Sequence, residues 1–469
     1  MYQIKENRKS NHQKLARANT QAIQRAVGFE VEVKNWRTYD PKTSYMDDLS
    51  LTRDFTLSRK KQKKNAKMFQ GRDFELTADQ PFSSHSVPEF ITEPFEENGS
   101  GRHKLHMAFG EISKMSKQLH DDSRSHPDML SRLDICQGLG QILMPDTIID
   151  ALEVPDFHPQ ANIGMRMAAM EPLFEIASVD IRNTPLAKRF TRIESLNNHD
   201  RFFWERKSLK NAHKRARNAL EDFSYAFPLY EGWQGSNELF NLFAYMIHYI
   251  ECPMINYHEY VKSAFPIMAR TDFFMMYRLL PLEEQDYFMA DDSKMFIKLF
   301  ELVKFGVYDG DAISLEEQFF EQGIRGNQYN ARNYRMDGLT RLEWIRQIPQ
   351  GQDLLTKRNF PDQALARELD TMGSWQKYDE LGEFETSAPI LEFRRLQYTD
   401  STEDLQKMAL EIFDFVVAMN KQEEAFSSQE QMKRSKPNMS DMAQVLNWQT
   451  DDSRDKSPAE FELDSIDES

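Results

Sequence analysis

The clearest periodicity near the start of the chain is an alternation of apolar and acidic residues. Phe29, Val31 and Val33 occupy every second position, and Glu30 and Glu32 stand between them. Successive side chains of a β-strand point to opposite faces. The pattern therefore predicts a strand with one apolar face and one acidic face.

The rest of the chain divides into further strands and a larger helical part. Two polar stretches, 59–67 and 154–164, are predicted to be a loop and an interruption between helices. Strands are predicted over 73–79, 89–93 and 390–396, and helices over 11–26, most of 103–250, 237–305 and 402–420.

These elements predict an α+β protein with a large helical portion. We expect an N-terminal helix or arm at 1–26, a main domain at 27–424 with a helical insertion around 200–350, and a disordered acidic tail at 425–469. From Asp451 onward the tail has eight acidic and two basic residues, too little apolar surface to offset the entropy of ordering it.

Composition excludes several classes of protein. Hydrophobic residues make up 40% of the 469 residues, which is enough for a sizeable core, and the net charge of −16 argues against a nucleic-acid coat or a polybasic membrane binder. No apolar run approaches the roughly 20 residues of a membrane span. The first residues lack the apolar stretch of a signal peptide, and the two cysteines, Cys136 and Cys252, suit a reducing interior. We expect a cytoplasmic protein.

The motifs of several common enzyme classes are absent from the sequence. It contains no GxxxxGK[ST] loop, no GxGxxG after a strand, no HExxH, no GxSxG and no CxxC pair. A P-loop ATPase, a Rossmann dehydrogenase, a zincin and an α/β-hydrolase are therefore poor interpretations.

Carboxylates on strands are the first candidate chemistry. Glu30 and Glu32 share a face and could hold a hard cation such as Mg²⁺, or they could be solvated glutamates on a half-exposed edge strand. Glu89 and Glu93 lie at strand spacing in the second acidic segment, and Asp79 could join them across a hairpin. The alternative for that segment is a strand end beside a proline turn.

A third acidic strand carries a cation as well. Glu392 and Arg394 share one face of the segment 390–396, and Leu391 and Phe393 share the other. This pair could be a structural ion pair, or a metal ligand next to an arginine that clamps phosphoryl oxygens.

Two cations stand in an apolar helical stretch of the chain. Lys262 and Arg270 could bind an anionic ligand, because buried cations need partners. Internal salt bridges to Glu259 or Asp272 are the alternative.

Two other patterns have ordinary explanations. His103 and His106 could face one way on a helix and bind zinc with His120, but the spacing suggests no fourth ligand. The basic segment 201–217 could contact RNA, although a solvated helix face is the preferred explanation.

Taken in order, these segments resemble the amidoligase branch of the carboxylate–amine ligases, enzymes with a glutamate–cysteine ligase-like fold of the glutamine synthetase type. The resemblance is confined to short, separate segments between about residues 27 and 396. The matching pieces are GFEVEV at 28–33, FELTAD and EFITEPF within 74–95 and LEFR at 391–394, with PQANIGMRMAAM at 159–170 and FPIMARTDF at 265–273 similar to segments between motifs.

The resemblance implies a curved antiparallel sheet whose inner face holds ATP and Mg²⁺. Such enzymes transfer the γ-phosphoryl group of ATP to a substrate carboxylate, and an amine then attacks the acyl phosphate. The substrate would be an amino acid, a peptide or a protein side chain. By matching position, the metal ligands would be Glu30, Glu32 and Glu93, with Glu392 as an addition, and the anion-binding cations would be Arg394, Lys262 and Arg270.

Two other functions fit the same residues. One is a non-catalytic interaction protein that keeps the sheet as a scaffold and uses its acidic tail for docking. The other is a metal-dependent hydrolase that needs no ATP. The oligomeric state does not follow from the sequence.

Overall fold

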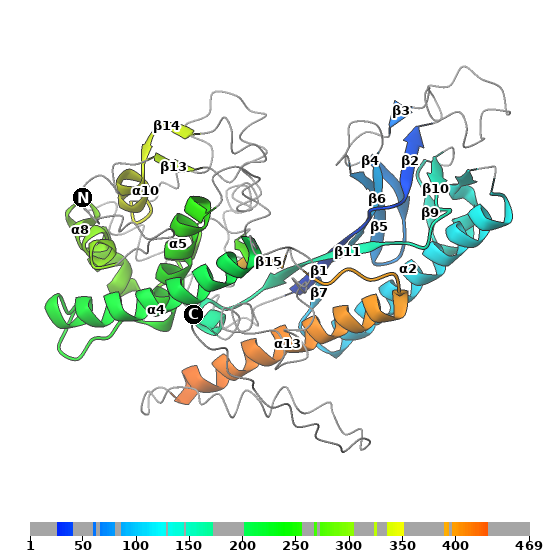
Figure 1. Cartoon of the computed structure of the whole chain (residues 1–469). Helices are drawn as coiled ribbons and strands as arrows, with labels where there is room; N and C mark the ends of the chain where they lie inside the picture. Colours follow the sequence, from blue (N-terminus) through cyan, green and yellow to red (C-terminus); the bar gives the residue numbers. More distant parts are fainter. Residues whose placement is uncertain are drawn as a thin grey trace, which may run out of the picture.

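The computed structural model combines one large antiparallel sheet with two groups of helices (Figure 1). Of the 469 residues, it describes 26–40, 60–61, 66–79, 86–127, 130–144, 147–171, 201–255, 267–269, 273–303, 323–325, 335–350, 389–393 and 396–429. The prediction of an α+β protein is confirmed for this part of the chain.

The large sheet has nine strands, and all its pairings are antiparallel. The order across the sheet is β12-β15-β11-β1-β6-β5-β4-β9, with β7 paired to β1. The strands are β1 (Ala26–Val33), β4 (Ala66–Gln70), β5 (Phe74–Asp79), β6 (Val87–Thr92), β7 (Phe95–Glu96), β9 (Gln141–Ile142), β11 (Phe157–Gly164), β12 (Ile267–Ala269) and β15 (Ile390–Phe393).

One face of this sheet is apolar and carries the hydrophobic core. Phe29, Val31 and Val33 of β1 are buried, as the alternation in the sequence predicts. The ring of Phe29 meets that of Phe109 edge to face, with 5.4 Å between the ring centroids. Phe109 belongs to helix α2 (Gly99–Ser125), so a helix covers this face.

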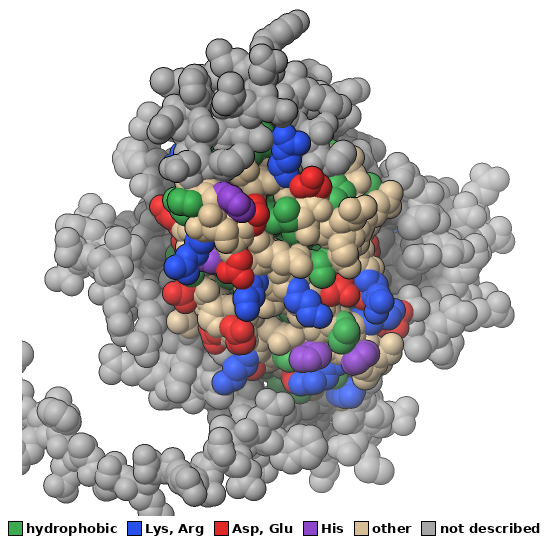
Figure 2. Space-filling view, turned by 90° about the vertical axis from the view of Figure 1, so that its right-hand side faces the viewer, with side chains coloured by type: hydrophobic (Ala, Val, Ile, Leu, Met, Phe, Trp, Pro, Cys, Tyr) green, Lys and Arg blue, Asp and Glu red, His purple; other side chains and the backbone are tan. Residues whose placement is uncertain are grey.

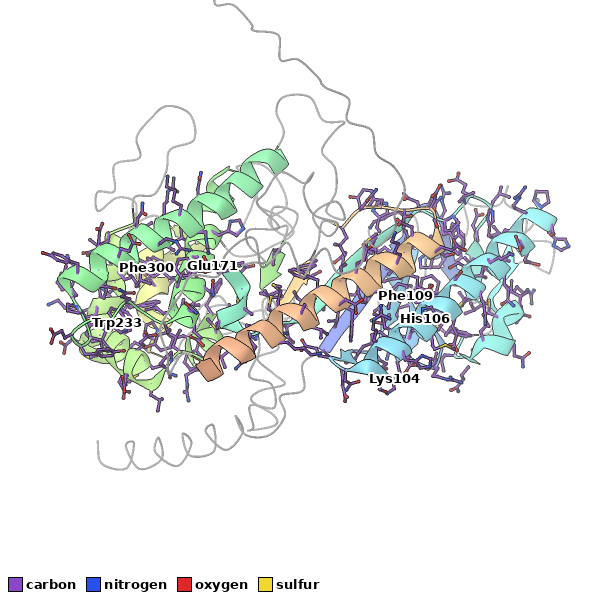
Figure 3. The ribbon with its side chains drawn as sticks, turned by 90° about the horizontal axis from the view of Figure 1, so that it is seen from below. Lys104, His106, Phe109, Glu171, Trp233 and Phe300 are labelled. Atoms are coloured by element: carbon purple, nitrogen blue, oxygen red, sulfur yellow. The ribbon has the colours of Figure 1, made fainter. Side chains whose placement is uncertain are left out.

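A second long helix, α13 (Thr402–Gln429), lies beside α2 in Figures 1 and 3. Arg102 of α2 holds Asp414 of α13 with two hydrogen bonds of 2.7 and 2.9 Å. The two helices, 312 residues apart at this contact, thus cover the apolar face together.

The start of α2 is fixed by its cap and by a glycine. Asn98 caps the helix by accepting a hydrogen bond from the amide of Gly101 at 2.8 Å. A Cβ on Gly101 would clash with the carbonyl oxygen of Glu96, so only glycine allows this close approach.

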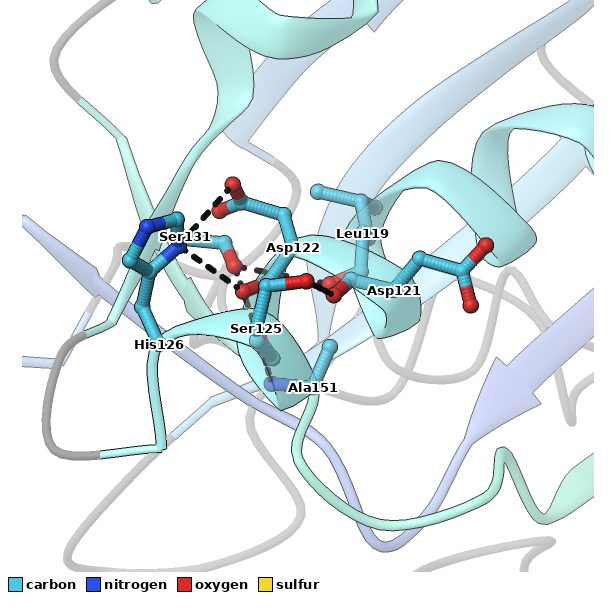
Figure 4. A network of polar contacts seen from close by, with 8 residues as sticks. Leu119, Asp121, Asp122, Ser125, His126, Ser131 and Ala151 are labelled. Atoms are coloured by element: carbon cyan, nitrogen blue, oxygen red, sulfur yellow. Dashed lines mark hydrogen bonds and ion pairs between the residues drawn. The ribbon is translucent and has the colours of Figure 1, made fainter.

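A small four-stranded sheet closes one end of α2. Its order is β3-β2-β10-β8, and the short helix η4 (Leu133–Leu139) lies beside α2. The hydroxyls of Ser123 and Ser131 are 2.7 Å apart, and the amide of Ala151 donates to Ser123 at 3.3 Å (Figure 4). The strands are β2 (Arg37–Asp40), β3 (Lys60–Lys61), β8 (Ser131–Arg132) and β10 (Ile148–Asp150).

The second group of helices forms the left-hand part of Figure 1 and has an aromatic interior. Phe223, Trp233 and Phe288 pack with ring centroids about 6 Å apart, and Trp233 and Phe300 are labelled in Figure 3. The elements are α4 (Arg201–Ala226), α5 (Asn237–Ile255), α7 (Phe273–Tyr277), α8 (Leu282–Glu301), α10 (Arg341–Gln347), β13 (Gly323–Arg325), β14 (Arg335–Thr340) and the short helix η5 (Met167–Ala169).

The second half of α13 is tied to the segment that follows β11. Asn420 is fully buried, accepts a hydrogen bond from the amide of Arg166 at 2.9 Å, and donates to the carbonyl of Gly164 at 3.1 Å. It also donates to the carboxylate of Glu97, just before α2. One side chain thus links α13 to two parts of the sheet region.

Four expectations from the sequence differ from this structure. The segment 154–164 is not a break between helices but contains β11, an interior strand of the sheet. The predicted loop at 59–67 contains β3 and the start of β4. Between 130 and 153, where helix was expected, the described residues include short strands and one short 3₁₀ helix. Residues 267–269, within the stretch 237–305 where helices were expected, form strand β12.

The proposed ends of the chain are described only in small part. Residues 1–25 and 430–469 lie outside the described residues. Ala26 belongs to β1, and α13 continues through Gln429, past the boundary at 425 that composition suggested.

Candidate functional site: an acidic face on the large sheet

The face of the large sheet opposite the core carries a row of carboxylates, called here the acidic face. Glu30 and Glu32 of β1 lie on it, as predicted from their spacing. In the pairing with β6, Glu30 lies opposite Ile91 and Glu32 lies opposite Glu89. The two acidic segments of the sequence are therefore neighbouring strands in register.

Strand β5 extends the acidic face. Thr77 lies opposite Glu89 and Glu75 lies opposite Ile91, so both share the face. Asp79, at the end of β5, acts electrostatically on Glu89, in keeping with the prediction that it joins the cluster across the hairpin.

Glu89 is the most perturbed of these carboxyl groups. Burial and the nearby charges of Glu30 and Asp79 raise the pKa of Glu89 to about 8, although a hydrogen bond from Thr77 and the charge of Lys34 oppose the rise. Glu89 is only 8% exposed. At neutral pH, without a bound cation, Glu89 therefore holds a proton.

Strand β11 contributes polar residues that no motif of the sequence indicated. His158, Gln160 and Asn162 alternate with buried residues and pair with β1 on its other side. Gln160 lies opposite Glu30, and His158 lies opposite Glu32. The segment FHPQANIG does alternate with the period of two that is typical of a strand. Its proline and glycine are typical of loops, however, and they favoured an interruption between helices.

Asn162 lies between two of the predicted metal ligands in the sheet. Its Nδ2 donates to Glu30 Oε1 at 2.9 Å. In the pairing with β15, Asn162 also lies directly opposite Glu392, which is fully buried. Glu392 is distant from β1 in the sequence, but in the sheet its strand β15 is separated from β1 by β11 alone.

Glu93 is placed differently from the other carboxylates. It follows the last residue of β6, is exposed, and its amide donates to the carbonyl of Asp73 at 3.0 Å. The charge of Glu93 contributes to the raised pKa of Lys67, so its carboxylate lies within electrostatic reach of that lysine.

Two lysines pair with carboxylates of the acidic face. Lys34 forms an ion pair with Glu32, and Lys67 Nζ lies 2.5 Å from Glu75 Oε2. The hydrogen bond and charge of Glu75 raise the pKa of Lys67. In this arrangement Glu32 and Glu75 are neutralised by side chains of the protein itself.

The donor chemistry of the acidic face fits Mg²⁺, because carboxylate oxygens on adjacent strands are the ligands that hard cations prefer. The side-chain orientations seen here pair these oxygens with Lys34 and Asn162 instead. Among the described residues, no three His, Cys, Asp or Glu side chains are grouped closely enough to hold a metal ion. His103, His106 and His120 are among the residues to which this finding applies.

Three predicted site residues lie outside the described residues: Arg394, Lys262 and Arg270. The same holds for Asp272 and Glu259, the alternative partners of the two helical cations. Their proximity to the acidic face stays a prediction.

The surface at the sheet end of the molecule has mixed charge. In the view of Figure 2, Lys and Arg side chains are interspersed with Asp and Glu over the described surface. No described helix is both long enough and apolar enough to cross a membrane.

Comparisons with protein-family models, with curated proteins and with solved structures found no match to this chain. The geometry of the acidic face and the sequence resemblance are therefore the grounds for a functional proposal.

Proposed function

We propose that this protein is an ATP- and Mg²⁺-dependent carboxylate–amine ligase of the glutamate–cysteine ligase-like, glutamine synthetase-type fold. The observation that carries the proposal is the register of β1 with β6, in which Glu32 lies opposite Glu89 with Glu30 two residues away on the same face. A sheet face that gathers partly buried carboxylates is costly unless a cation or a proton compensates them.

The proposed ligands for Mg²⁺ are Glu30, Glu32 and Glu93, with Glu392 as an addition. Bound Mg²⁺ would neutralise the negative charge on the nucleotide phosphates. Burial first, and then the charges of Glu30 and Asp79, raise the pKa of Glu89. Those like charges would also favour a cation at the same face, which supports this assignment.

The protein's own side chains would do the positioning on which phosphoryl transfer depends. Asn162 holds the carboxylate of Glu30, and Lys34 holds that of Glu32. The proposed contacts to the transferred phosphate or to the substrate carboxylate come from three cations: Arg394, which directly follows the last residue of β15, Lys262 and Arg270.

The proposed reaction has two steps. The γ-phosphoryl group passes to an oxygen of a substrate carboxylate, giving an acyl phosphate and ADP. The nitrogen of an amine then attacks the carbonyl carbon, and the bond to phosphate breaks to leave an amide. The proposed substrate class is an amino acid, a peptide or a protein side chain, and the proposed compartment is the cytoplasm.

A non-catalytic interaction protein is the second candidate, and one observation favours it. Glu32 and Glu75 are already paired with Lys34 and Lys67, which leaves fewer carboxylates in need of a cation. In that case the acidic face would be a structural polar layer, and ATP would have no effect on the protein.

Product analysis tests the proposal. The purified protein is incubated with ATP, Mg²⁺ and a mixture of amino acids and peptides, and ADP and new amide products are measured by mass spectrometry. The ligase predicts ADP in step with an amide product, and both require Mg²⁺. An amide or ester cleaved without ATP would indicate a hydrolase, and no turnover would favour the interaction protein.

A further inference from the structure

An aromatic stack stands at the end of the acidic face. His158 of β11 and Tyr398, which follows β15, lie with ring centroids 3.7 Å apart and planes 17° from parallel. His158 lies opposite Glu32, and directly opposite residues have Cβ atoms about 5 Å apart. The stack is therefore next to Glu32, one of the carboxylates proposed to bind the metal.

Both rings of the stack are held in place by their surroundings. His158 Nε2 lies 2.9 Å from Asp156 Oδ2, which fixes the orientation of the imidazole. The backbones of Phe157 and Thr399 exchange two hydrogen bonds, of 2.9 and 3.2 Å, beside the stack. These bonds fix the backbone next to each member of the aromatic pair, so the stack is preorganised.

Tyr398 keeps a large contact with solvent in spite of this packing. It is 44% exposed, although one side of its ring is stacked on the imidazole. The stack therefore offers aromatic surface at the edge of a charged face.

We propose that Tyr398, backed by His158, is the platform on which the planar base of a purine nucleotide stacks. The choice of a nucleotide rests on the proposed function, which assigns the phosphates to the acidic face beside His158. Stacking on an aromatic side chain needs a planar π-system and tolerates different bases. The base of the nucleotide would thus lie against Tyr398, in the segment that follows β15.

Calorimetric binding of ATP and of tripolyphosphate, each with Mg²⁺, separates the base from the phosphates. Tyr398→Leu removes the ring and should weaken ATP binding about tenfold or more, the loss of one base–aromatic stack. Tyr398→Phe keeps the ring and should bind ATP nearly as wild type does. Tyr225→Leu, which removes a 92% exposed tyrosine of α4, is the matched control and should bind as wild type does.

Tripolyphosphate should bind equally to wild type and Tyr398→Leu. Adenosine alone should bind wild type weakly and the leucine variant more weakly still. An equal ATP affinity in wild type and Tyr398→Leu would overturn the platform and leave the ligase proposal standing. A loss of tripolyphosphate binding along with that of ATP would also overturn it, because the tyrosine would then be structural.

The two proposals can fail separately. If wild type binds neither ATP nor adenosine, both are wrong. If adenosine binds in a manner that depends on Tyr398 but Mg²⁺ and phosphates add nothing, the platform stands and the ligase proposal falls. Melting temperatures of all variants, measured beforehand, exclude a binding loss caused by unfolding.

Discussion

Glu32 of β1 lies directly opposite Glu89 of β6, so two carboxyl groups from separate segments of the chain meet on one face of the sheet. Like charges in directly opposite positions of antiparallel strands destabilise the sheet. The structure accommodates them by pairing Glu32 with Lys34 and by raising the pKa of Glu89. A change of pH or the binding of a cation should therefore change the protonation and the ion pairing of the carboxyl groups on the acidic face.

The first prediction concerns Glu89 and pH. With a pKa of about 8 in the folded protein and an ordinary value of 4.5 in the unfolded chain, Glu89 binds more protons when folded. Its contribution to stability is fully present below pH 4.5 and is lost as pH rises toward 8, by up to about 1.4 kcal/mol per pH unit. Glu89→Gln mimics the protonated form and should remove this loss.

Urea unfolding of wild type and Glu89→Gln between about pH 5 and pH 8.5 checks this prediction. The glutamine variant should be the more stable protein at the alkaline end and should show the flatter profile. Glu96→Gln, at an exposed position of β7, is the control and should follow wild type. Parallel profiles for wild type and Glu89→Gln would contradict a raised pKa.

The second prediction concerns the attachment of α13. Asn420→Ala removes the partner of the Arg166 amide and of the Gly164 carbonyl, and the site is fully buried. Buried polar groups left without partners cost about 1–3 kcal/mol each, so the loss of both partners should lower the unfolding free energy by about 2–6 kcal/mol. Lys421→Ala, at the exposed neighbouring position, should change it by less than about 0.5 kcal/mol. Equal stability of the two variants in chemical denaturation would show that Asn420 does not hold α13.

The third prediction concerns a buried carboxyl in the helical part. Glu284 accepts hydrogen bonds from Trp233 Nε1 at 3.0 Å and from the amide and hydroxyl of Ser236 at 2.7 and 2.6 Å. Glu284→Ala should cost about 2–4 kcal/mol, because it leaves these donors without an acceptor. Glu284→Gln should cost less, since its amide oxygen still accepts.

Thermal and urea unfolding of both variants, beside Glu283→Ala, measure this effect. Glu283 is exposed on the same turn and should be nearly neutral to substitution. A Glu284→Ala protein as stable as Glu283→Ala would mean that these hydrogen bonds contribute nothing to folding.

The strands with a plain alternation could be predicted from the sequence. Phe29, Val31 and Val33 face the core because their spacing is that of a strand and their side chains are apolar. Strand β11 could not be predicted by the same reasoning, because Pro159 and Gly164 are typical of loops. Its pairing with both β1 and β15 makes it an interior strand, and that depends on contacts distant in sequence.

The candidate site was predictable only in part: the common face of Glu30 and Glu32 follows from the sequence, but the residues of β11 and the grouping of the strands do not. The spacing of Glu30 and Glu32 predicts their common face, whereas the position of Glu89 opposite Glu32 depends on which strands pair and in which register. The contact of Asn162 with Glu30 spans 132 residues of sequence. The packing of a whole sheet, rather than any local pattern, assembles the acidic face.

The measurement that tests the central claim most directly is the melting temperature of wild type, Glu30→Gln and Glu32→Gln with and without Mg²⁺ and ATP. A ligand that binds only the folded protein stabilises it by about 2.7 kcal/mol at a hundred times its Kd. Wild type should therefore melt at a clearly higher temperature with Mg²⁺ and ATP, and both glutamine variants should gain much less. Glu221→Gln, exposed on α4, should gain as much as wild type. An equal gain in all four proteins, or no gain in wild type, would contradict the proposal that the acidic face binds Mg²⁺ and ATP.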